Sequence, residues 1–187
     1  MGISNFRNRA GYTIVLYLGL CLLIDIASRV VGQLQINNLI LFSFLSFFEI
    51  LIFSYLYWSK LKKSRWLQIL TVLGLTYLVY EGLTLDQSDT INYQTYARNV
   101  SSLIIVLLVL KYIFSELKAG STLKGETLHF ILLSYYSLEF MLLIPFNFLI
   151  NSSVTAIMYI WDARILLNFI FYAYLTFYLW SNGKTRI

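Results

Sequence analysis

Six long runs of apolar residues follow one another along this chain and occupy nearly all of its 187 residues. Each run holds about 20 residues, which is the length that an α-helix needs to cross the hydrocarbon core of a bilayer. Inside lipid, a segment that satisfies all of its own backbone hydrogen bonds is a helix. The sequence therefore predicts an all-α, polytopic transmembrane helix bundle of about six spans, at roughly 12–32, 36–58, 66–84, 96–115, 127–150 and 156–180.

The composition agrees with a chain that lies almost entirely in the membrane. Hydrophobic residues make up 59% of the chain and charged residues 12%, and a soluble domain carries about twice that share of charge. The sequence has no Pro-rich or Ser-rich linker, so we expect residues 1–187 to form a single transmembrane domain. The net charge of +5 reflects basic residues at the ends of the spans, which indicates a membrane protein and not a nucleic-acid-binding surface.

The positions of lysine and arginine predict the orientation of the chain. Ten basic residues fall on one side of a six-span arrangement: Arg7, Arg9, Lys60, Lys62, Lys63, Arg65, Lys118, Lys124, Lys184 and Arg186. The other side carries Asp86 and Asp89, and we assign Arg98 to a connection near that side. Because cytoplasmic loops are enriched in basic residues, both termini are expected in the cytoplasm, with the chain in the lipid bilayer of a bacterial cytoplasmic membrane.

Several classes of chemistry lack the residues that they require. The chain has one cysteine, Cys21, and one histidine, His129, which are too few for a disulfide or for a metal site built on nitrogen and sulfur. The sequence motifs GxSxG, HExxH and CxxC are absent. We therefore predict no metal, no cofactor and no nucleophilic catalysis by serine or cysteine, and we expect His129 at the membrane interface.

Two glutamates lie near the middle of predicted spans, Glu49 in the second and Glu139 in the fifth. We assign no basic residue to their depth, so both are expected to be neutral and to bond to hydroxyls on their own helices. Ser46 precedes Glu49 by three residues, and Tyr135 and Tyr136 precede Glu139 by four and three. The pair is interpreted as a proton-carrying site, as a polar binding centre, or as hydrogen-bonding glue between helices.

A second group of ionisable residues lies toward the outer ends of the spans: Asp25, Arg29, Glu81, Asp162 and Arg164. Asp25 and Arg29 are four residues apart and are able to pair on one helix face. The group predicts a charged network that lines an outward cavity. The alternatives are a set of ion pairs that pins the helices together, and side chains that reach the interface without partners.

A few polar positions resemble a group of small multi-span bacterial membrane proteins of uncharacterised function. Asn37-Asn38 opens a span and Glu49 follows one bilayer half later, and in the last span Asn168 precedes Trp180 by twelve residues. The resemblance adds the three asparagines to the candidate polar site. That group often has an additional N-terminal span, and a histidine at the position that Arg164 holds here.

Three functions remain in view. The first is a non-enzymatic membrane component, either a sensor or receptor-like module or a subunit of a larger membrane complex, with a protein partner or as a homo-oligomer. The second is a small proton- or cation-coupled transporter or channel that uses Glu49 and Glu139. The third is an intramembrane enzyme that acts on lipid or isoprenoid with these carboxylates as acid and base, which requires them to lie within about one helix diameter, roughly 10 Å.

Overall fold

The computed structural model describes residues 3–33, 39–58, 63–84, 96–120, 126–149 and 154–184. These ranges contain six α-helices and no strand, which confirms the all-α bundle. The helices are α1 (Ile3–Gln33), α2 (Leu39–Leu56), α4 (Arg65–Thr84), α5 (Ala97–Lys118), α6 (Glu126–Leu149) and α7 (Val154–Lys184). Each one coincides with a predicted span to within a few residues, except that α1 begins and α7 ends further out.

Five of the helices are long and apolar enough to cross a membrane, with apolar segments at Ala10–Val31, Arg65–Thr84, Ala97–Lys118, Thr127–Phe146 and Thr155–Ser181. The apolar segment of α2, Ile40–Leu56, is shorter. Large apolar side chains also cover the outward faces of the helices, such as Leu22 and Leu23 on α1 and Phe169 and Ile170 on α7. A water-soluble bundle does not expose so much continuous apolar surface, and the fold is that of an integral membrane protein.

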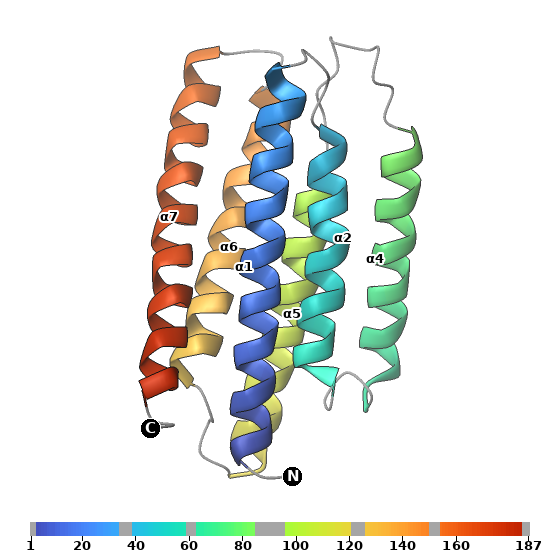
Figure 1. The fold of residues 1–187 in the computed structure, drawn as a ribbon. Helices are drawn as coiled ribbons and strands as arrows, with labels where there is room; N and C mark the ends of the chain where they lie inside the picture. The colour runs from blue at the N-terminus through green and yellow to red at the C-terminus, as the bar shows by residue number, and fades with distance from the viewer. Residues whose placement is uncertain are drawn as a thin grey trace.

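The helices run side by side, and α1 begins at the same end of the bundle at which α7 ends (Figure 1). Five of them close a ring in the order α1, α2, α5, α6, α7, because each contacts the next and α7 contacts α1. We call this the five-helix ring. Helix α4 lies outside it and packs against α2 and α5. The five-helix ring therefore surrounds one interior to which every member can contribute side chains.

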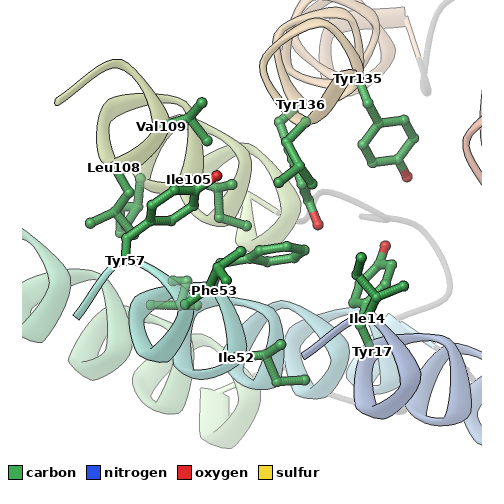
Figure 2. Packing of buried hydrophobic residues seen from close by; sticks show 14 of the residues in the cluster. Ile14, Tyr17, Ile52, Phe53, Tyr57, Ile105, Leu108, Val109, Tyr135 and Tyr136 are labelled. Atoms are coloured by element: carbon green, nitrogen blue, oxygen red, sulfur yellow. The ribbon is translucent and has the colours of Figure 1, made fainter. Parts of the chain in front are cut away.

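Aromatic side chains fill much of that interior. Figure 2 shows Tyr17 of α1, Phe53 of α2 and Tyr136 of α6 pointing toward one another. The ring centroids are 5.3 Å apart for Tyr17 and Phe53 and 5.4 Å apart for Phe53 and Tyr136. Phe171 of α7 stacks on Tyr135 with 3.7 Å between centroids. Tilted and offset ring contacts of this kind add to the stabilisation that burial gives.

A glycine lets α4 approach α5 closely. Gly74 is buried, and a Cβ atom built at this position would overlap the Cδ1 atom of Ile104 on α5. Small residues permit such close contact between membrane helices. Gly74 therefore sets the distance between α4 and the outer side of the five-helix ring.

The first turn of α5 is buried inside the bundle. Ala97, Arg98 and Asn99 are all buried, although the first turn of a helix leaves its backbone N–H groups without intrahelical partners. Glu81 of α4 supplies one partner, since its Oε1 atom accepts a hydrogen bond from the backbone N–H of Ala97 at 3.2 Å. A carboxylate at this end of a helix is also favoured by the helix dipole, so α4 and α5 are joined where α5 begins.

Candidate functional site

Arg98 binds two carboxylates that come from the helices on either side of α5. Its Nη1 atom lies 2.7 Å from Oε2 of Glu49 on α2. Its Nη2 atom lies 2.5 Å from Oε1 of Glu139 on α6, to which Nε also donates at 3.2 Å. The rigid fork of a guanidinium suits this arrangement because it presents several donors in one plane.

Arg164 of α7 adds a second cation to the same site. Its Nη2 atom lies 3.4 Å from Oε1 of Glu139. The guanidinium carbon also lies 5.2 Å from the ring centroid of Phe42 and 5.3 Å from that of Trp161. Contacts with aromatic faces stabilise a cation electrostatically, so Arg164 is held by one carboxylate and two rings.

Three hydroxyl groups complete the site. Tyr17 of α1 donates to Oε1 of Glu49 at 3.2 Å, and Ser101 of α5 donates to Oε2 of Glu49 at 3.3 Å. Ser102 of α5 donates to Oε2 of Glu139 at 3.3 Å. Every helix of the five-helix ring thus supplies at least one member of what we call the central charge cluster: Tyr17, Glu49, Arg98, Ser101, Ser102, Glu139 and Arg164.

The central charge cluster is sealed and its charges balance. Glu49 and Glu139 are 0% exposed, Arg98 is 3% exposed and Arg164 is 7% exposed. Two carboxylates face two guanidinium groups, so the fully ionised cluster is neutral. Ions taken out of water cost several kcal/mol each, and good pairing with additional hydrogen bonds offsets that cost. The removal of any one of the four ions leaves an unbalanced charge in the interior.

Our assignment of Arg98 to a connection is wrong, and so is the conclusion that no base lies at the depth of the two glutamates. Helix α5 begins at Ala97, so Arg98 occupies its first, buried turn. The sequence contained a signal for this position. Arg98 falls inside the predicted span 96–115, and Ser101 and Ser102 follow it with the spacing that puts polar side chains on the same side of a helix.

The expected hydroxyl partners on the glutamates' own helices are also wrong. Glu49 and Glu139 bond to side chains from other helices, while the hydroxyls of Ser46 and Tyr136 have no hydrogen-bond partner among the described residues. Tyr135 donates instead to Oδ1 of Asn168 on α7 at 2.8 Å. A guanidinium forms stronger hydrogen bonds with a carboxylate than a neutral hydroxyl does, which favours Arg98 over groups one turn away. Of the three asparagines, Asn168 thus lies next to the cluster, whereas Asn37 and Asn38 lie outside the described residues.

The five residues predicted as an outer network do not gather in one place. Arg164 belongs to the central charge cluster, and Glu81 caps the start of α5. Asp25 and Arg29 on α1 and Asp162 on α7 are exposed on the surface of the bundle. Asp162 and Arg164 separate because residues two apart on an α-helix point in nearly opposite directions.

A second polar contact, away from the central charge cluster, joins Tyr57, the residue that follows α2, to α5 and α6. The hydroxyl of Tyr57 lies 2.7 Å from Nδ1 of His129, and the ring centroid of Tyr112 lies 4.4 Å from that of the imidazole. His129 is 0% exposed and so is packed inside the bundle; it lies two residues from the start of the apolar segment Thr127–Phe146, and its place at the depth of the membrane interface stays a prediction. Within the described residues, no group of three or more His, Cys, Asp or Glu side chains is arranged to hold a metal ion.

The geometric condition set for an intramembrane enzyme is met. Glu49 and Glu139 bind nitrogen atoms of one guanidinium, so their carboxylates are closer than one helix diameter, about 10 Å. Arg98 lies between them, however, and both carboxylates are fully buried. In the described structure both carboxylates are therefore already occupied by the guanidinium of Arg98.

Comparisons with protein-family models, with curated proteins and with solved structures find no match to this chain. The features that bear on function are therefore the arrangement of the helices and the central charge cluster.

Proposed function

We propose that this protein is a non-enzymatic integral membrane component, a receptor-like module or subunit that acts by assembling with another protein of the membrane. It resides in a bacterial cytoplasmic membrane with both termini in the cytoplasm, which the distribution of lysine and arginine supports. The soluble connections are short, so the surface available for recognition is the helical surface itself.

The observation that carries this proposal is the sealing of the central charge cluster. Its four ions neutralise one another, and all are less than a tenth exposed. A catalytic or transport site needs access for its substrate, and a cavity of about 330 Å³ between α2 and α4 is lined mostly by apolar residues, with Ser43 among them, and by no member of the cluster. The cluster fixes the positions of five helices, which is the role of a scaffold that presents its outer faces.

The test is purification of the tagged protein from native membranes in a mild detergent. We expect one membrane protein to co-elute in a fixed ratio, and the same complex to be recovered when the tag is moved to that partner. Arg65→Leu serves as a control because Arg65 is exposed and its loss leaves the fold unchanged. The proposal is contradicted if the chain is recovered alone from native membranes and also carries ions across the bilayer of reconstituted vesicles.

A proton- or cation-coupled transporter is the second candidate, and buried hydroxyls favour it. Ser43 and Ser46 have no hydrogen-bond partner among the described residues. They precede Glu49 at intervals of three residues, which puts the three side chains along one side of α2. Such a row offers polar groups that lead to a buried carboxylate.

Proton flux into proteoliposomes separates the two candidates. A transporter loses flux when Glu49 is changed to Gln and retains it in the control variant Asp25→Asn, because Asp25 is exposed. A membrane component without transport activity gives the flux of empty vesicles in all three preparations. Flux in the unmodified protein that disappears only in Glu49→Gln replaces the first proposal by the second.

A further inference from the structure

One carboxylate in a membrane-spanning segment faces away from the bundle. Asp162 lies on α7 within the apolar segment Thr155–Ser181 and is exposed. Arg164, two residues later, is buried and contacts Glu139. At 100° of rotation per residue these two side chains point in nearly opposite directions, so Asp162 is on the side of α7 that is turned from the interior of the five-helix ring.

The depth of Asp162 makes its exposure costly. It follows Thr155 by seven residues, which places it about 10 Å along the helix axis from the end of the apolar segment. A charged side chain within the hydrocarbon core is unfavourable, because lipid does not replace the water that solvates the charge. Its carboxylate sits on one methylene group, so it cannot reach the interface in the way that a long lysine or arginine side chain does.

Two other exposed charged residues near this end of the bundle, Arg29 and Asp25, are placed so that a charge in the hydrocarbon core is less unfavourable. Arg29 is two residues from the end of the apolar segment Ala10–Val31 and has a long side chain. Asp25 has Arg29 one turn further along the same helix. Asp162 forms no ion pair or hydrogen bond with another described residue. Unlike Asp25, Asp162 has no basic residue one turn away on its own helix, because positions 158, 159, 165 and 166 are all uncharged.

The surface around Asp162 is suited to a helix. Exposed residues on the same side of α7 include Tyr159, Leu166, Phe169 and the small Ala173, which repeat at the intervals expected for one face of a helix. An apolar stripe with a single exposed charge is the kind of surface that membrane helices use to pair, because a polar contact in lipid has few competitors.

We propose that this face of α7 binds a transmembrane helix of another protein, and that this helix carries a lysine or arginine at the depth of Asp162. The inference rests on the proposed function and names the partner's chemistry. Charge complementarity selects a cationic helix, since Asp162 is acidic and the only base within one turn of it on α7, Arg164, is turned inward.

The experiment uses the purified full chain in phosphatidylcholine vesicles and a designed poly-leucine transmembrane peptide. One peptide carries a single Arg placed about 10 Å from its end, and the other carries Leu at that position. Energy transfer between labelled protein and labelled peptide reports binding. We expect the Arg peptide to bind about tenfold more tightly than the Leu peptide, as a polar contact of 1–2 kcal/mol implies.

Two variants assign this preference to Asp162. In Asp162→Asn the preference for the Arg peptide is lost, and in Asp162→Arg it is replaced by a preference for a peptide that carries Asp. Because residue 162 is exposed, both variants retain the helical content and melting temperature of the unmodified protein. The control variant Asp25→Asn retains the preference for the Arg peptide.

Two outcomes overturn the inference. The first is equal binding of the Arg and Leu peptides by the unmodified protein. The second is energy transfer between two labelled copies of the protein that disappears in Asp162→Asn, because a second copy is then the occupant of this face. Neither outcome bears on whether a native partner co-purifies, so a failure here is distinct from a failure of the proposed function.

Discussion

Arg98 and Glu139 are joined by two donors of one guanidinium, with Nη2 at 2.5 Å and Nε at 3.2 Å from the same carboxylate oxygen. The residues are 41 positions apart in the chain and belong to α5 and α6. Since the remaining arm of Arg98 binds Glu49 on α2, one side chain ties together three helices. The stability of the bundle should therefore depend on Arg98 more than on the other basic residues.

Replacement of Arg98 by Leu should destabilise the protein by about 3–5 kcal/mol, because it leaves two buried carboxylates without their shared cation. The exposed Arg65 provides the control, and Arg65→Leu should change stability by less than about 0.5 kcal/mol. Unfolding of both variants in detergent, followed by circular dichroism, measures the difference. Equal stability of the two variants would show that Arg98 does not hold the cluster together.

Glu139 and Arg164 should be energetically coupled. Each single change to Gln removes the 3.4 Å ion pair, so the double variant should lose less stability than the sum of the two single variants, with a coupling of about 0.5–3 kcal/mol. The same cycle between Glu139 and the exposed Arg29 should give no coupling. If the two single losses of stability add up to that of the double variant, the ion pair between Glu139 and Arg164 contributes no interaction energy.

Replacement of Gly74 by Ala should weaken the packing of α4 on α5. The new methyl group overlaps Ile104, and the extra volume in a packed interior costs about 1–3 kcal/mol. Gly19 offers a matched control, because a Cβ atom there has no neighbour within 4 Å. Gly19→Ala should leave stability unchanged or raise it by up to about 1 kcal/mol. Thermal melting of the two variants side by side distinguishes crowding from helix propensity, and a loss in both contradicts the close approach.

Replacement of Tyr57 by Phe should cost about 0.5–1.5 kcal/mol, because it removes the buried hydrogen bond between the Tyr57 hydroxyl and Nδ1 of His129. Tyr159→Phe removes a hydroxyl from an exposed tyrosine and should be neutral. Denaturant titration in detergent measures both. A neutral effect of Tyr57→Phe would mean that the contact between Tyr57 and His129 contributes nothing to stability.

The helices were predictable because apolar runs of membrane length have one viable backbone conformation. The side of each helix that faces the interior of the bundle was not predictable. Apolar residues surround each helix on all sides, so no stripe marks the side that faces the interior. For this reason the spacing of Asp162 and Arg164 puts them on opposite faces of α7 but does not tell which of the two faces the interior, and it does not tell that Asp25 is exposed.

The two glutamates were identifiable as the deepest acids, and the structure brings them together. Their partners were not identifiable, because ion pairs between helices depend on which helices are neighbours. The five-helix ring is closed by a contact between its first and last members, α1 and α7, and no spacing within the chain encodes that contact. The assignment of Arg98 to a connection hides its role as their partner. Its position inside the predicted span 96–115 nevertheless indicates a base within the membrane.

The order of residues in the central charge cluster has a consequence for how the chain enters the lipid. Synthesis delivers acids and bases in alternation, since Glu49 in α2 is followed by Arg98 in α5, Glu139 in α6 and Arg164 in α7. Glu49 is therefore inserted ahead of its counterion Arg98, whereas Glu139 follows Arg98 and precedes only its second base, Arg164. The second base arrives only with α7, so the four buried ions reach a neutral balance when the last helix has been inserted.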